Sequence, residues 1–143
     1  HPFVIYYNRE DGTLKHLNYV FISEYLKRNT VAFHLFQTFL ISDLKKCIPN
    51  LKKIFQFLDG LSAQYKNRKN FCNICLHKND FGLDAKWHCF ATAHGKSTCD
   101  GLGGTVKRLA AKASLQRPYE EQIMTPQQLF DFAQEYIPGI NFK

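Results

Sequence analysis

The sequence has no long apolar run, although it is rich in hydrophobic residues. No stretch reaches the roughly 18 consecutive apolar residues that a membrane helix requires, so no membrane is expected as a partner. Hydrophobic residues still make up 45% of the 143 residues and aromatic residues 15%, enough for a substantial core. The length is that of one domain. We therefore predict a single domain over residues 1–143, with a C-terminal helical extension at about 118–143.

Signals for secretion are also missing. The chain starts at His1-Pro2, with no Met, charged leader or signal-peptide pattern, which predicts an N-terminally incomplete piece of a longer protein. Its cysteines number five, an odd count, and two of them form a Cys72-x-x-Cys75 pair. This count argues against a disulfide framework and favours a reducing compartment, the nucleus or the cytoplasm, over secretion.

Acidic residues are scarce. The chain has 19 Lys and Arg against 12 Asp and Glu, for a formal net charge of +7. The bias is strongest between Lys66 and Arg117, where the only acids are Asp80, Asp84 and Asp100. This excess predicts a polyanionic partner, nucleic acid before membrane, because no basic helix with a clean apolar face is found. The alternative is a solvated basic surface.

A nucleotide-binding loop is absent. The segment His94-Gly95-Lys96-Ser97 resembles the end of a P-loop, but Phe90 occupies the position of the first glycine that the motif requires. We therefore expect no nucleotide cofactor.

What the sequence does contain is strand patterns alternating with helix patterns. Short apolar runs predict strands over residues 3–7, 14–25, 52–58 and 85–93. The Asp11-Gly12 turn is typical of a hairpin between the first two strands. The third strand is almost wholly apolar, which is typical of a strand buried on both faces.

Four helices are predicted between and after these strands. Helical spacing predicts one from Thr30, as its N-cap, to Cys47, and a shorter one over residues 70–78 that ends at Phe81-Gly82. Capping-box patterns start the other two helices, at Ser97 and at Thr125. The resulting order, β-β-α-β-α-β-α-α, predicts an α/β fold with a mixed sheet flanked by helices.

Two of the strands lead into acidic residues. Asp59 follows the apolar run that ends at Leu58, and Asp100 follows the next strand along the chain. In open α/β sheets, ligands and metals gather where strands end, and two converging carboxylates suit a divalent metal. The alternatives are a turn residue for Asp59 and a helix-capping acid for Asp100.

The segments Phe57-Leu58-Asp59-Gly60, 64–67 and 94–108, together with the element order, resemble the catalytic core of the DDE/D transposase and integrase superfamily. Within this superfamily, the segments are most similar to uncharacterised transposon-derived proteins of invertebrates. The resemblance covers roughly residues 3–136. It implies an RNase H-like three-layer fold that lacks its first strand. Asp59 matches the second acid of the triad and Asp100 the third, as Asp instead of the commoner Glu. The first acid is not found.

The resemblance implies a transposase-derived domain for DNA binding and metal-dependent DNA strand cleavage and transfer, inactive as this fragment. Asp59 and Asp100 would be catalytic residues that bind Mg²⁺ or Mn²⁺ for an in-line displacement. Residues expected to contact DNA are Lys66, Arg68, Lys69, His94, Lys96, Lys107 and Arg108.

Three glycines occur in the predicted helix that follows Asp100. Gly101, Gly103 and Gly104 would each cost about 1 kcal/mol of helix stability relative to alanine. Two explanations are open: the helix packs tightly against the sheet, or a phosphate backbone approaches it closely.

Two other functions remain open. The first is a non-catalytic nucleic-acid or protein-interaction module, a domesticated or degenerate transposase. The second is a zinc-stabilised binding domain with Cys72 and Cys75 as ligands, although zinc knuckles sit in turns and these residues lie in a predicted helix. Because a missing strand exposes a sheet edge, we also expect the chain to form a homo-oligomer.

Overall fold

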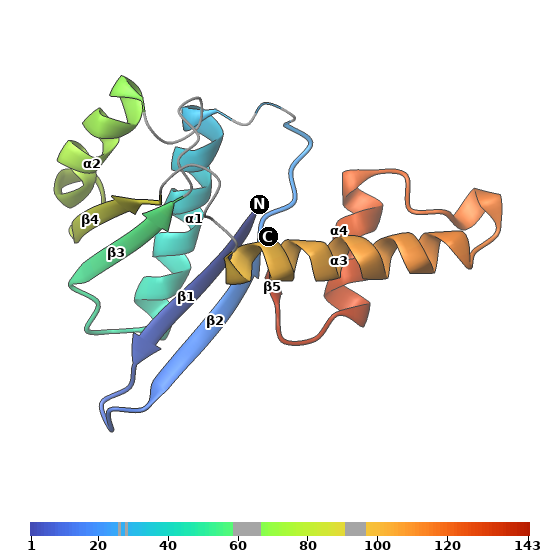
Figure 1. Cartoon of the computed structure of the whole chain (residues 1–143), viewed down its shortest axis with the longest axis horizontal. Coiled ribbons are helices and arrows are strands. Elements are labelled where there is room, and N and C mark those ends of the chain that lie inside the picture. The colour runs from blue at the N-terminus through green and yellow to red at the C-terminus, as the bar shows by residue number, and fades with distance from the viewer. Residues whose placement is uncertain (26, 28, 59–66, 91–96) are drawn as a thin grey trace. The chain divides into compact units, whose positions relative to one another are not determined.

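The computed structural model describes residues 1–25, 27, 29–58, 67–90 and 97–143 (Figure 1). The chain is mixed α/β, which confirms the predicted class. Its elements are β1 (Pro2–Asn8), β2 (Leu14–Val20), α1 (Thr30–Cys47), β3 (Lys53–Leu58), α2 (Arg68–Phe81), β4 (Asp84–Cys89), α3 (Thr98–Leu115), a 3₁₀ turn (Tyr119–Glu121), α4 (Pro126–Tyr136) and β5 (Asn141–Phe142). They form two compact units: a first unit of His1–Glu24 with Lys96–Lys143, and a second unit of Tyr25–Gly95.

The first unit contains a mixed sheet in the order β1-β2-β5. β1 and β2 are antiparallel along their whole lengths, as the hairpin prediction requires. In the turn, Gly12 has a φ of 81°, a backbone conformation that glycine adopts without strain. The side-chain hydroxyl and the backbone N–H of Thr13 both donate to Asp11, and these hydrogen bonds lower the pKa of that carboxyl group.

Strand β2 is shorter than the predicted strand over residues 14–25. It ends at Val20, where its registers with β1 and with β5 both end. The next two backbone N–H groups donate to the carbonyls of His1 and Lys143. β5, which the sequence pattern does not predict, pairs parallel with the end of β2.

Helices α3 and α4 complete the first unit. Both begin with the predicted capping boxes, Ser97 with Asp100 and Thr125 with Gln128. The core that they share with the sheet consists of Val20, Val106, Ala110, Phe132, Ala133, Ile137 and Phe142. The C-terminal segment therefore contributes buried residues to this core.

The second unit contains a parallel pair, β3 and β4, joined through α2. Helix α1 lies against one face of this pair. There the ring of Phe33 meets that of Trp87 edge to face at 5.8 Å between centroids, and Gln37 donates to Gln56 at 2.8 Å. The opposite face carries Phe55 and Phe57, which are exposed. The prediction that this strand is buried on both faces is therefore wrong.

Two helix starts in the second unit also differ from the predictions. The N-cap of α1 is Asn29, whose side chain accepts from the N–H of Ala32, and Thr30 is the first helical residue. Thr30 instead donates its hydroxyl to Asn67, the N-cap of α2. With Asn67 as its cap, α2 begins two residues before the predicted start, and it ends at Gly82, whose φ of 66° closes the helix.

Candidate functional site

The predicted site residues are divided between described and undescribed segments. Four of them lie outside the described residues: Asp59, Lys66, His94 and Lys96. The predicted proximity of Asp59 and Asp100 therefore concerns a residue that the structure does not describe. The remaining residues occupy two helices. Asp100, Lys107 and Arg108 belong to α3 in the first unit, and Arg68 and Lys69 to α2 in the second unit.

Asp100 lies exposed in the first turn of α3. Its Oδ2 accepts from the backbone N–H of Ser97 at 2.9 Å and from the Ser97 hydroxyl at 3.4 Å. Among the described residues, no hydrogen bond is found to Oδ1. The structure therefore confirms that Asp100 caps α3, and the residue that bears this carboxylate is exposed.

A groove of about 490 Å³ runs between the β1–β2 hairpin and the start of α3. Tyr6 and Thr98 approach across it, with 3.3 Å between their hydroxyl oxygens. Further lining comes from Val4, His16, Asn18, Gly101, Leu102 and Thr105. The groove surface is more apolar than polar and has no Asp, Glu, Lys or Arg in its lining, and its helical wall continues into the basic part of α3.

The glycines of α3 are not explained by packing on the sheet. A Cβ added at Gly101 or Gly104 would meet nothing within 4 Å among the described residues, whereas one at Gly103 would make an ordinary contact with Pro2. Gly101 and Gly104 are both exposed. The tight-packing explanation is therefore wrong for these two, and the contacts of the described residues give no reason for their helical cost of about 1 kcal/mol each.

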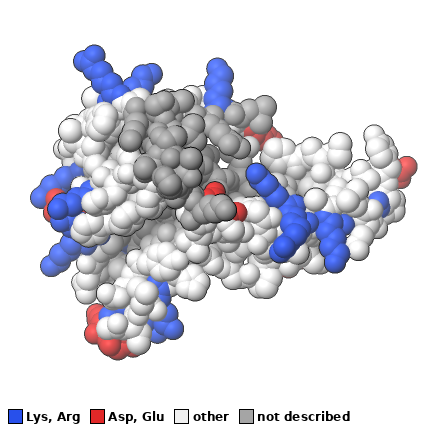
Figure 2. Space-filling view, viewed as in Figure 1, with Lys and Arg blue, Asp and Glu red and all other residues white. Residues whose placement is uncertain are grey.

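Basic residues follow these glycines along the solvent side of α3. Lys107, Arg108 and Lys112 are all exposed, and Asp100 is the helix's one acid. Figure 2 shows basic side chains projecting from the surface formed by α3. Lys112 was not among the predicted site residues. Its position four residues after Arg108 is the signal that would have found it, because residues four apart share a helix face.

Arg68 and Lys69 occupy the first turn of α2, and both are exposed. The partial positive charge at the N-terminus of a helix disfavours cations there. No acid lies in this first turn to compensate. Helix stability therefore does not account for the two charges, which remain candidates for phosphate contacts.

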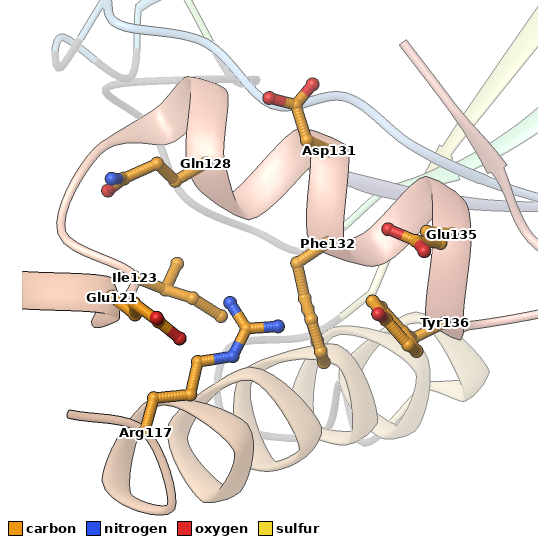
Figure 3. Close-up of a pocket in the computed structure, with 8 residues that line it drawn as sticks. All are labelled: Arg117, Glu121, Ile123, Gln128, Asp131, Phe132, Glu135 and Tyr136. Carbon is orange, nitrogen blue, oxygen red and sulfur yellow. The ribbon is translucent and has the colours of Figure 1, made fainter.

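A second, smaller cavity of about 210 Å³ lies beside α4 (Figure 3). The guanidinium of Arg117 points into it and lies 5.5 Å from the centroid of the Phe132 ring. Acidic groups of Glu121, Asp131 and Glu135 also line it. Its mixed charge and shallow form identify no particular ligand.

The predicted zinc ligands Cys72 and Cys75 are exposed and lie within α2, in the helix that the sequence indicates. Within the part of the chain that the structure describes, no group of three or more His, Cys, Asp or Glu side chains could hold a metal ion. No helix formed by the described residues is long and apolar enough to cross a bilayer.

Comparison with known proteins gives one result at the level of family. The search of curated proteins and the search of solved structures each find no match. A family model does match, over residues 1–143, and it is described as a domain of unknown function, DUF8701. Because the match spans the whole chain, the protein belongs to the DUF8701 family.

Proposed function

We propose that this chain is a transposase-derived, RNase H-like domain that binds DNA through the solvent side of α3. The observation that carries the proposal is the makeup of that side. Gly101 and Gly104 leave the helix surface bare near its start, and Lys107, Arg108 and Lys112 follow within the same helix. A bare helix surface followed by cations suits close approach of a phosphate backbone.

The order of the elements supports the RNase H-like part of the proposal. A hairpin, a long helix and a parallel β-α-β unit follow one another, and α3 begins after the last of these strands. The resemblance implies a further strand that would come before the hairpin. No strand among the described residues takes that place.

Metal-dependent strand cleavage and transfer would rest on Asp59 and Asp100. Carboxylate oxygens are the ligands that hard cations such as Mg²⁺ or Mn²⁺ prefer, and Asp100 is exposed. Bound there, such ions would activate the attacking oxygen and stabilise the leaving one. Lys107 lies seven residues after Asp100, about two helical turns on, where it would hold the phosphate backbone of the same strand.

A second candidate is a non-catalytic DNA-binding module, a degenerate or domesticated transposase. The observation that favours it is the capping box, which gives Asp100 a structural role that needs no metal. Both candidates share the α3 surface, and they differ in whether the carboxylate of Asp100 binds a cation.

The salt dependence of duplex DNA binding tests the shared part of the proposal. We expect the affinity of the whole chain for a labelled 20-base-pair duplex to fall steeply as the salt concentration rises. The reason is that Lys and Arg side chains that contact phosphates release counterions from the DNA, and this release is less favourable at high salt. Changing Lys107, Arg108 or Lys112 to Ala, one at a time, should flatten the logarithmic slope by about 0.9 for each contact removed. Fluorescence anisotropy at several salt concentrations measures this slope of log affinity against log salt concentration.

Lys46→Ala on α1 is the matched control, because it removes the same charge from an exposed side chain of another helix, 3.9 Å from Asp43. Its slope should equal that of the unmodified chain. If the control flattens the slope as much as Lys107→Ala does, binding reflects net charge alone and the α3 surface is not the DNA site.

A further inference from the structure

The face of the β3–β4 pair that points away from α1 carries a row of aromatic rings. Alternation along the strands places Phe55 and Phe57 of β3 on this face, together with His88 of β4 and Phe90 just after it. Phe55 is 54% exposed, Phe57 62% and Phe90 40%. Large aromatic rings rarely gather in the open on a folded domain unless something binds there. We call these four side chains the aromatic row.

The rings of the aromatic row stand nearly parallel. From Phe55 to His88 the centroids are 6.3 Å apart with 21° between planes, from His88 to Phe57 5.1 Å with 18°, and from Phe57 to Phe90 6.1 Å with 27°. This is an ordered, offset stack in which each ring supports the next. Such a stack holds its exposed ring surfaces in place before any ligand arrives, which limits the entropy lost on binding.

Positive charge lies at one end of the row. The ammonium of Lys53 lies 5.1 Å from the centroid of the Phe55 ring, and Lys86 is directly opposite Phe55 in the register. The only acid in β4 is Asp84, whose carboxylate lies 3.2 Å from the ammonium of Lys78. Asp84 is directly opposite Lys53 in the register, and its charge is shared with Lys78. The face therefore combines exposed rings with two lysines and a single acid.

We propose that the aromatic row binds single-stranded nucleic acid, with bases stacked on the rings and phosphates near Lys53 and Lys86. Rings beside cations are the combination that sequence-tolerant single-strand binding requires, because every base has a face that can stack. Aromatic rings are also enriched in protein interfaces, but the two lysines beside the row supply the charge that phosphates require. On strands β3 and β4, the side of the pair that bears the row has no aliphatic side chain.

A duplex does not fit this face. The faces of paired bases are covered by their neighbours in the stack, so a flat sheet meets only the backbone and the groove edges. Unpaired bases can be splayed out and stacked on aromatic side chains of a sheet. The site is thus different in kind from the basic side of α3, and it stands whether or not α3 binds duplex DNA.

The test is the affinity of the whole chain for a fluorescently labelled 20-nucleotide oligo(dT) with no duplex content. Phe57→Ala should weaken binding about tenfold or more, the effect of losing one stacked base, whereas Phe57→Trp should retain it. The matched control is Phe71→Ala, which removes a ring that is 63% exposed on α2 outside the row, and it should bind like the unmodified chain. Duplex binding should not change with Phe57→Ala.

Two results would overturn the proposal. Equal oligo(dT) binding by the unmodified chain and Phe57→Ala would mean that net charge alone holds the strand. Absent oligo(dT) binding, with self-association that Phe57→Ala abolishes in sedimentation, would make the row a protein interface. Should Phe57→Ala fail to fold by circular dichroism, Lys86→Glu provides the same test with all rings kept, and an unchanged oligo(dT) affinity there rejects the site.

Discussion

Asp100 performs one task that the structure shows and would perform a second that we propose. Its Oδ2 accepts two hydrogen bonds from Ser97, which fixes the first turn of α3. The same exposed carboxylate would contribute to a Mg²⁺ or Mn²⁺ site in the catalytic hypothesis. The two tasks use charge differently, because a neutral amide can still accept a hydrogen bond but is a much weaker ligand for a hard cation.

Substitutions at Asp100 separate these tasks. Asp100→Asn keeps a carbonyl oxygen for the cap, so the free energy of unfolding should fall by less than about 1 kcal/mol, whereas Asp100→Ala should lose about 1 kcal/mol. Urea unfolding measures both. If the catalytic hypothesis holds, calorimetric titration with Mn²⁺ should show binding that disappears in Asp100→Asn. Mn²⁺ binding that persists in Asp100→Asn would leave the residue with its capping role only.

At the scale of single elements, α3 contains glycines whose cost to helix stability is not explained by the part of the chain that the structure describes. Gly101 and Gly104 face open space among the described residues, while Gly103 lies near Pro2 with 3.5 Å between the ring's Cγ and the position of an added Cβ. A helix selected for stability alone would have alanine at the two open positions. Under the proposed function, close approach of a DNA backbone would account for both glycines.

Gly104→Ala should raise the free energy of unfolding by about 1 kcal/mol, because the new methyl group meets no neighbour and alanine is the better helix former. Gly104→Leu should keep the fold and weaken duplex binding, because its side chain would hold the phosphates away. Gly103→Ala, which also replaces a helical glycine by a better helix former but lies at the Pro2 contact, should leave duplex binding unchanged. Equal duplex binding by Gly104→Leu and the unmodified chain would contradict the backbone-approach explanation.

At the scale of the whole molecule, the exposed apolar surface bears on the expected homo-oligomer. Val31, Leu35 and Phe39 lie four residues apart on α1, so they share one side of the helix, and they are 64%, 51% and 55% exposed. An apolar row of this kind typically marks an association surface. The sequence-based reason for expecting self-association was a missing strand; the structure adds this second reason.

We expect the chain to self-associate in a concentration-dependent way, and Leu35→Glu to shift it to the monomer because a carboxylate would be buried in the contact. Sedimentation velocity over a range of concentrations measures this. Leu115→Glu, at an 83% exposed leucine at the end of α3, is the control and should associate like the unmodified chain. A chain that is monomeric at every concentration would remove the oligomer from the expected partners.

Features that depend on neighbouring residues were predictable from the sequence. The Asp11-Gly12 turn, the capping boxes at Ser97 and Thr125, and the helix end at Gly82 all follow from conformational preferences and hydrogen bonds within a few positions. The α/β class follows for the same reason, since hydrophobic periodicity records which side of each element is apolar.

Tertiary structure decided whatever depends on residues distant in the sequence. Asn29 and Thr30 could both cap α1. Asn29 takes this role, while Thr30 donates its hydroxyl to Asn67 at the start of α2, a helix distant in the sequence. β5 is only two residues long, and it becomes a strand by pairing with β2 across the chain. Phe55 and Phe57 are exposed although their strand is apolar on both sides, because α1 covers the side bearing Gln56. Local pattern shows that a side chain is apolar, but only packing selects which apolar side becomes the core.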